Sequence, residues 1–256
     1  MVTATVNETI VLPGDVHVAS DRDDLFDDLG SWVTAVAARS VDERGVFHVA
    51  LSGGSTPEPF YMRLVIDPRF RGIPWQRTHV WLVDERRVPQ DDERSNWRMI
   101  RESLVDHVPA KRRHLHPMPV LDDDPATRYE AQLREAFGHE DIPAMDFILL
   151  GMGDDTHTAS LFPGSDATRV TDRWIAVNDG PKVTPPPRVT MTFPLLNAAR
   201  HVAVLCCGEG KRDALQRVAA QWRDTGPDPQ AMPITGVDPE DGELMWYLDA
   251  SAAGRD

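Results

Sequence analysis

The chain has 256 residues, of which 41% are hydrophobic and 27% are charged. This composition is ordinary for a globular protein with a sizeable core, and the length allows one large α/β domain or two small ones. With 41 acidic against 27 basic residues, the formal net charge is −14. Such a field repels phosphodiester backbones and anionic lipid surfaces, so neither nucleic acid nor a membrane is expected as a partner.

The sequence predicts a soluble, cytoplasmic protein. Residues 1–13 lack the basic segment and long apolar core of a signal peptide, and no apolar run approaches the length of a membrane span. Cys206 and Cys207 are adjacent in an apolar run, which is typical of buried strand residues and provides no disulfide framework.

Apolar segments alternate with helical patterns from the start of the chain. Residues 9–12 and 16–18 are strand-like, and Ser20–Asp23 forms a plausible cap for an amphipathic helix ending near Ser40. A short apolar run then stops at glycines before a helix that begins at Pro57, where proline suits the first turn.

The same alternation continues to about residue 222. Further strands are expected at 79–85, 145–151, 174–177, 188–193 and 201–206, and further helices at 95–105 and 211–222. This order predicts a mainly parallel central sheet flanked by helices on both faces, a Rossmann-like three-layer sandwich. The Pro- and Asp-rich stretches at 117–125 and 224–240 are interpreted as loops, so we expect a single domain over residues 1–256.

Ligands of such sheets bind at the carboxyl ends of the strands, where polar loops therefore matter most. The first such loop contains Gly53, Gly54, Ser55 and Thr56, between a buried strand and a helix. Backbone amides, hydroxyls and a helix start suit an anion, although a plain strand-to-helix turn has the same pattern. The second loop contains Asp84, Glu85, Arg86 and Arg87, which suit phosphate and sugar hydroxyls or form a solvated loop of ion pairs.

The most informative segment is GMGDDTHTASLFPG at 151–164, where Asp155 stands two residues before His157. A histidine can activate water and then protonate a leaving alkoxide, and a carboxylate can fix its tautomer. Glycine amides of the turn would stabilise an oxyanion. A helix-capping or core histidine is the alternative. Two single cations, Arg188 after a proline run and Lys211 near a helix start, are weaker candidates for anion binding.

Together these segments resemble the 6-phosphogluconolactonase family of the sugar-phosphate isomerase/deaminase-like superfamily. The matching segments are LSGGSTP, VDERRVP with DxxxSN, GMGxDxHTASLFPG, PPPRVTMTFPLLNAAR and GEGK, in the expected order over about residues 48–211.

The resemblance implies hydrolysis of 6-phosphoglucono-1,5-lactone to 6-phosphogluconate in the oxidative pentose phosphate pathway, with no metal and no cofactor. It implies that His157 is the acid/base and that Asp155 orients it. The substrate pocket would hold Gly53, Gly54, Ser55 and Thr56. Phosphate would be bound by Arg86, Arg188 and Lys211, with Asp84 fixing Arg86 or the sugar hydroxyls.

One position departs from the family pattern, since Thr156 stands where a glycine is usual between the aspartate and the histidine. If that position needs a positive φ, a β-branched residue is strained there by roughly 1–3 kcal/mol. The alternative is a turn that has relaxed to an ordinary conformation. Thr156 therefore bears on the catalytic rate more than on the fold.

Two other functions stay open. A glucosamine-6-phosphate deaminase-like isomerase shares the scaffold, but its Asp-Glu-Tyr and Asn-Glu-Pro segments are replaced here by DERRVP and SLFPG. A catalytically weak sugar-phosphate binding protein is the second. The resemblance also leaves open a functional link to glucose-6-phosphate dehydrogenase, and either a monomer or a small homo-oligomer.

Overall fold

The computed structural model describes residues 10–138 and 141–255. Its central sheet has seven strands, all paired in parallel. Their spatial order is β1 (Asp15–Ala19), β10 (Glu243–Asp249), β9 (His201–Cys206), β6 (Phe147–Gly151), β2 (Phe47–Leu51), β3 (Thr78–Leu82) and β5 (Leu115–His116). The predicted parallel sheet is therefore confirmed.

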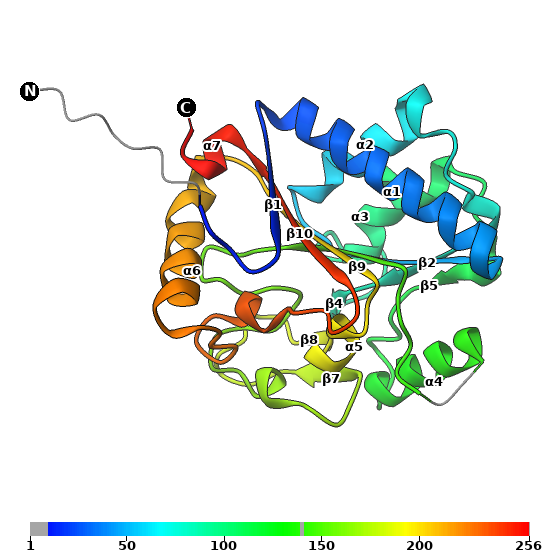
Figure 1. The fold of residues 1–256 in the computed structure, drawn as a ribbon. Coiled ribbons are helices and arrows are strands. Elements are labelled where there is room, and N and C mark those ends of the chain that lie inside the picture. Colours follow the sequence, from blue (N-terminus) through cyan, green and yellow to red (C-terminus); the bar gives the residue numbers. More distant parts are fainter. Residues whose placement is uncertain (1–9, 139–140, 256) are drawn as a thin grey trace, which may run out of the picture.

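Helices cover both faces of this sheet (Figure 1). Three of them follow connections that run toward β5, namely α1 (Arg22–Arg44), α2 (Pro57–Ile66) and α3 (Asn96–Ser103). The others follow connections that run back toward β1, namely α4 (Pro125–Phe137), α5 (Phe193–Asn197) and α6 (Arg212–Thr225). Because parallel crossovers are right-handed, the two directions place the helices on opposite faces. A short α7 (Ala250–Ala253) follows β10.

The connections also contain single turns of 3₁₀-helix. These are η1 (Pro68–Phe70), η2 (Trp75–Arg77), η3 (Val105–His107), η4 (Arg112–His114), η5 (Asp166–Arg169), η6 (Glu209–Lys211) and η7 (Pro233–Gly236). Of these, η6 and η7 lie close to the site described below.

A second sheet of three antiparallel strands was not expected from the sequence. Its order is β4 (Asp84–Arg86), β8 (Arg188–Met191) and β7 (Ile175–Asn178). The segments at 174–177 and 188–193 therefore lie outside the parallel sheet. The reason is the connection at 179–187, which contains no helix, so the chain returns beside β7 in the antiparallel direction.

The first elements also differ from expectation. Residues 10–12 form no strand, and the strand-like segment at 16–18 lies within β1. The cap of α1 is Asp21, whose side chain accepts a hydrogen bond from the Asp24 amide, and the helix runs past Ser40 to Arg44. It ends at Gly45, whose φ of 78° is the left-handed conformation that glycine adopts without strain.

The core lies between the sheet and its helices. Every residue of β2 is buried, and both Trp81 and Trp246 are fully buried. Cys206 and Cys207 are buried free thiols, as expected, and burial raises the pKa of each to about 12. Among the described residues, no helix has both the length and the apolar character that a membrane span requires.

Aromatic rings stack on one another where β2, β3 and β5 lie side by side. The imidazole of His116 lies flat on Trp81, with ring centroids 3.6 Å apart, and its Nε2 is 2.9 Å from Nδ1 of His79. The Trp81 indole donates a hydrogen bond of 3.1 Å to Nδ1 of His48. These histidines are thus part of the packed edge of the sheet.

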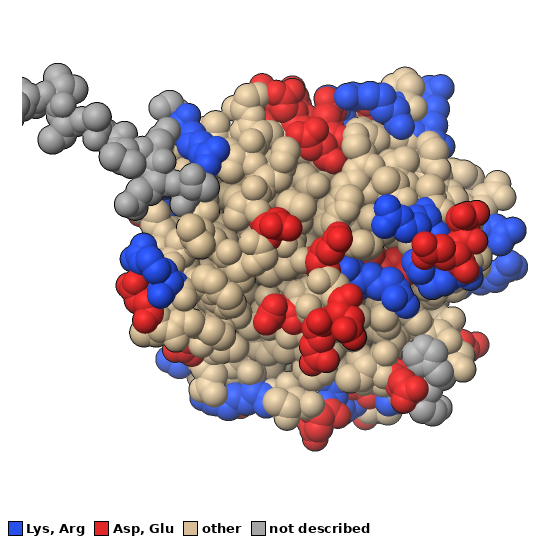
Figure 2. Space-filling view, in the orientation of Figure 1, with Lys and Arg blue, Asp and Glu red and all other residues tan. Residues whose placement is uncertain are grey.

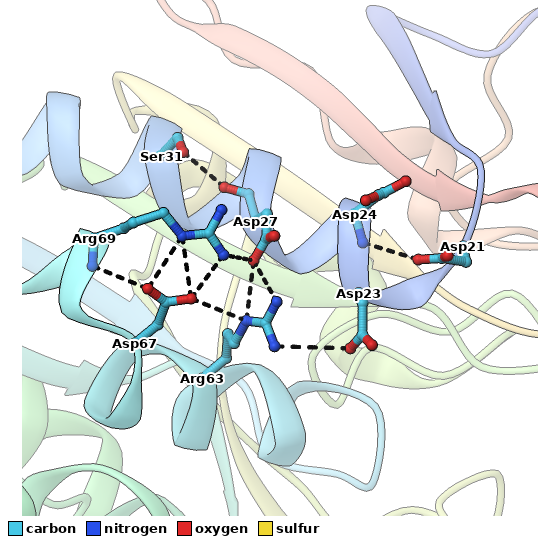
Figure 3. A network of polar contacts seen from close by, with 8 residues as sticks. All are labelled: Asp21, Asp23, Asp24, Asp27, Ser31, Arg63, Asp67 and Arg69. Carbon is cyan, nitrogen blue, oxygen red and sulfur yellow. Dashed lines mark hydrogen bonds and ion pairs between the residues drawn. The ribbon is translucent and has the colours of Figure 1, made fainter.

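An ion-pair network joins α1 to α2 and to the chain that follows α2 (Figure 3). Asp27 on α1 contacts Arg63 on α2 and Arg69 in η1, at 2.7 and 2.6 Å. Asp67 contacts the same two arginines, which completes the network. Elsewhere on the face drawn in Figure 2, acidic and basic side chains are interspersed.

Candidate active site

A cavity of about 350 Å³ opens at the carboxyl ends of the central strands. The loops after β2, β6 and β9 form its walls together with the small antiparallel sheet. The predicted site residues that line it are Gly53, Gly54, Ser55, Thr56, Asp84, Arg86, His157, Arg188 and Lys211. Asp155 stands behind His157, so the structure brings all the predicted residues to one place.

His157 lies in a tight turn that follows β6. The Gly153 amide donates to the His157 carbonyl, and the Thr156 amide donates to the Gly153 carbonyl, both at 2.9 Å. The Gly153 amide is therefore engaged within the turn, which corrects the expectation that it would stabilise an oxyanion. The His157 ring packs on Phe162, with centroids 4.8 Å apart.

Asp155 holds the His157 imidazole from one side. Its Oδ1 lies 2.5 Å from Nδ1 and accepts a 3.1 Å hydrogen bond from the His157 amide. Burial acts to raise the pKa of Asp155, but the hydrogen bonds and charge of His157 outweigh burial and leave that pKa below its ordinary value. An ionised Asp155 accepts the Nδ1 proton, so in the neutral ring Nε2 is the proton acceptor.

Thr156 keeps the left-handed conformation despite its β-branched side chain. Its φ is 70°, it is fully buried, and its hydroxyl has no hydrogen-bond partner. Its carbonyl accepts a 3.1 Å bond from the amide of Ile234 in η7, which anchors the turn. Of the two outcomes foreseen for this position, the strained one is present, and the Asp155–His157 contact forms nonetheless.

Two arginines are paired across the small sheet. Arg86 on β4 pairs directly with Arg188 on β8, and both line the cavity. Burial, and then the charge of Arg86, lower the pKa of Arg188 from its ordinary value. Arg86 donates one hydrogen bond to the Arg94 carbonyl at 2.7 Å, and Arg188 donates one to the Pro186 carbonyl. Each guanidinium has five donors, so both retain capacity for an anion.

The neighbouring Arg87 does not reach this cavity. Its guanidinium donates to the carbonyls of Val120 and Asp122, at 2.9 and 3.3 Å. The pair of adjacent arginines foreseen as a bidentate anion site is therefore split, because consecutive residues of an extended segment point in opposite directions.

Asp84 contacts Ser160 and Asn96. One carboxylate oxygen accepts from the Ser160 hydroxyl at 2.5 Å, and the other accepts from the Asn96 side-chain amide at 3.2 Å. Asn96 also explains the glycine at position 53, because a β-carbon there would lie 1.8 Å from the Asn96 side-chain oxygen.

Glu85 is a buried residue whose role the sequence did not reveal. Its carboxylate accepts hydrogen bonds from the amides of Asn96 and Trp97 at the start of α3, at 2.7 and 2.8 Å. Burial raises the pKa of Glu85, and these amide bonds oppose that rise. The sequence feature that could have indicated this role is the DxxxSN spacing, which places a capping serine and Asn96 at the start of the helix.

Lys211 lies in η6, after β9, and its ammonium contacts the Asp154 carboxylate at 2.6 Å. Lys211 is thus at the cavity, where the sequence placed it, but paired with an acid. Among the described residues, no group of three or more His, Cys, Asp or Glu side chains is placed to hold a metal ion.

Comparisons with known proteins identify the family of this chain. Residues 20–246 match the family model of glucosamine-6-phosphate isomerases/6-phosphogluconolactonase. The 6-phosphogluconolactonase of Nostoc sp. is 40% identical over 240 residues, which cover 87% of this chain and 94% of the relative. That of Synechocystis sp. is 42% identical over 229 residues, which cover 86% and 89%. A GDH/6PGL endoplasmic bifunctional protein of Oryctolagus cuniculus is 39% identical, but the matched region spans only 29% of its length.

Solved structures give the same result. The 6-phosphogluconolactonase of Thermotoga maritima is 29% identical and aligns with a TM-score of 0.75, over 92% of this chain and 99% of that one. The enzyme of Leishmania guyanensis is 26% identical, with a TM-score of 0.79 over 94% and 98%. A monomeric glucosamine-6-phosphate deaminase, 19% identical with a TM-score of 0.73 over 94% and 100%, shares the fold alone.

Proposed function

Because this chain belongs to the family of glucosamine-6-phosphate isomerases and 6-phosphogluconolactonases, we propose that it hydrolyses 6-phosphoglucono-1,5-lactone to 6-phosphogluconate, a step of the oxidative pentose phosphate pathway. The observation that carries the proposal is the Asp155–His157 pair, which opens onto a cavity that also holds Arg86 and Arg188. An acid/base thus stands beside a binding site for a phosphate group.

His157 performs both proton transfers in this mechanism. Its Nε2 takes a proton from water while the water oxygen bonds to the lactone carbonyl carbon. The tetrahedral intermediate then expels the ring oxygen, which receives the same proton from Nε2 as the ring bond breaks. The products are a hydroxyl and a carboxylic acid, which ionises in solution. The Asp155 carboxylate stabilises the imidazolium between these two steps.

The cations hold the other end of the substrate. Arg86 and Arg188 bind the phosphate group through charge-assisted hydrogen bonds, and Lys211 adds a third positive charge. The glycine-rich loop at 53–56 supports the sugar, and Asp84 reaches its hydroxyls or steadies the wall through Ser160 and Asn96. General acid–base catalysis of this kind typically gives a factor of ~10²–10⁴ in rate.

The partner enzyme, the compartment, the oligomeric state and the metal independence of this activity remain predictions. The names of the bifunctional relatives join GDH to 6PGL, which supports a functional link to the dehydrogenase that supplies the lactone. We expect a cytoplasmic protein that is a monomer or small homo-oligomer and uses no metal.

The test is an assay of lactone hydrolysis with and without chelator, on the wild type and on His157→Asn. We expect equal wild-type rates in both conditions, and a loss of ~10²–10⁴-fold in the variant with 6-phosphogluconate binding retained. His107→Asn, an exposed histidine outside the cavity, is the matched control and should keep the full rate.

Each alternative function predicts a different result. Faster release of ammonia from glucosamine 6-phosphate than hydrolysis of lactone would establish the isomerase function. Binding of 6-phosphogluconate by the wild type without hydrolysis would establish the binding protein. A chelator-sensitive rate would contradict the metal-free mechanism.

A further inference from the structure

Lys211 and Asp154 form an ion pair at the edge of the cavity. They come from neighbouring strands, since Asp154 follows β6 and Lys211 follows β9, and these strands are paired. The Lys211 side chain is 22% exposed and lines the cavity, whereas the Asp154 side chain is 81% exposed and does not line it. Asp154 therefore approaches the ammonium from the solvent side.

The backbone of Asp154 is fixed while its side chain projects into solvent. The Arg217 guanidinium on α6 donates to the Asp154 carbonyl, so the main chain is tied to α6. The next residue, Asp155, uses its carboxylate on His157. Two consecutive carboxylates thus have separate tasks, and rotation of the Asp154 side chain leaves the Asp155–His157 contact in place.

This arrangement determines how much positive charge Lys211 presents to a ligand. Asp154 neutralises Lys211 in this contact, so a phosphate group that approaches Lys211 competes with a carboxylate already bound there. Exposed ion pairs contribute little to stability, and the Asp154 carboxylate can return to water at low cost. A phosphate dianion that Arg86 and Arg188 also hold binds the Lys211 ammonium more strongly than the Asp154 carboxylate does.

We propose that Asp154 is an exchangeable counter-ion of Lys211, which the phosphate group of the substrate displaces, and that it thereby sets the affinity for phosphorylated ligands. The proposal deepens the function given above and rests on it. Asp154 occupies the position written x in GMGxDxHTASLFPG, so the family pattern assigns it no role. Asp154 is here a specificity-determining residue that acts through Lys211.

The test is calorimetric titration of four forms of the full chain: wild type, Asp154→Asn, Lys211→Met and the double variant. The probes are 6-phosphogluconate, inorganic phosphate and gluconate. We expect Asp154→Asn to bind both phosphate-bearing probes about two- to five-fold more tightly, the size of an exposed ion pair, and gluconate as the wild type does. In the Lys211→Met background, Asp154→Asn should have no effect.

Several results would overturn the proposal. Weaker binding of phosphate-bearing probes by Asp154→Asn would show that Asp154 clamps Lys211 in position. An equal effect on gluconate, or an effect that persists without Lys211, would show that the ion pair is not the cause. Unchanged affinity would show that Asp154 does not compete.

The proposed function is judged separately by the lactone hydrolysis assay described above, because binding of these probes does not require turnover. If the wild type does not hydrolyse lactone but Asp154→Asn binds the phosphate-bearing probes more tightly, the lactonase function is rejected and the counter-ion role of Asp154 is retained. If the wild type binds neither phosphate-bearing probe, both proposals are rejected.

Discussion

The imidazole of His157 lies directly against the backbone of Gly153. A β-carbon at position 153 would lie 2.1 Å from Nδ1 of His157 and 2.7 Å from Oδ1 of Asp155. The Asp155–His157 pair therefore occupies the volume that a side chain at position 153 would fill, so glycine is required there for space and not for its backbone conformation.

Replacing Gly153 by alanine should displace the imidazole. We expect Gly153→Ala to lower kcat/KM for the lactone by at least ~10²-fold, since a misplacement of about 1 Å costs that much in rate. Gly180→Ala is the matched control, because a β-carbon there meets nothing within 4 Å, and it should keep the wild-type rate. A folded Gly153→Ala enzyme with full activity would contradict the packing argument.

The protein should be more stable with glycine in place of Thr156. The left-handed backbone strains a β-branched residue by ~1–3 kcal/mol, and the buried hydroxyl without a partner adds a desolvation cost. Lost methyl burial and the greater freedom of glycine in the unfolded chain offset about half of this. We expect Thr156→Gly to raise the free energy of unfolding by ~1 kcal/mol in urea titrations.

Thr156→Ser tests whether the methyl group of the threonine is a source of that change. Serine keeps the β-carbon, the backbone strain and the hydroxyl, so this variant should gain no stability. A stabilisation equal to that of Thr156→Gly would show that the methyl group, and not the backbone, is the source of strain.

The stacked histidines make the fold sensitive to acid. The Trp81 indole can only donate, so Nδ1 of His48 must stay unprotonated to accept that bond. Burial lowers the pKa of His48 and His116 to about 3 and that of His79 to about 4. The unfolded chain thus binds more protons than the native state between these values and 6.5, so stability is full above pH 6.5 and falls as the pH drops.

Each such histidine contributes a slope of up to ~1.4 kcal/mol per pH unit below pH 6.5. Urea titrations of the wild type from pH 8 to pH 4 should show this decline. His116→Phe keeps a ring on Trp81 but cannot be protonated, so its decline should be shallower. Parallel curves for the two proteins over this range would exclude the cluster as the cause.

The ion-pair network of Figure 3 should stabilise the docking of α1 on α2. Asp27 contacts Arg63 and Arg69 and is about one-fifth exposed, whereas Asp23 is 81% exposed and lies 3.9 Å from Arg63. We expect Asp27→Asn to lower the free energy of unfolding by ~1 kcal/mol, and Asp23→Asn to change it by less than ~0.5 kcal/mol. Equal effects of the two variants would show that overall charge, and not this contact, is responsible.

The parallel sheet and the gathering of the site loops could be predicted from the sequence. Apolar runs that end in glycines identify strands, and parallel strands bring their following loops to one edge, which is why Gly53, His157 and Lys211 meet. The Asp155–His157 spacing was also sufficient to place the carboxylate beside the ring.

Other features depend on contacts between distant residues. The antiparallel pairing of Arg86 with Arg188 joins segments about a hundred residues apart, and strand propensity says nothing about which strand is the partner. The orientation of Arg87 away from the cavity follows from that pairing. The Lys211–Asp154 pair needed the register of β6 and β9, which periodicity does not supply.

The position of β1 at the edge of the sheet has a consequence for how the chain folds. Its only strand neighbour in the described structure is β10, the last strand in the sequence, with Asp15 beside Met245 and Ala19 beside Asp249. On the ribosome, β1 therefore leaves the exit tunnel long before its partner has been synthesised. Pairing of such distant segments is slow, and unpaired strand edges invite aggregation in the interval. Synthesis of β10 is thus the event that gives β1 its strand neighbour and β9 its second one.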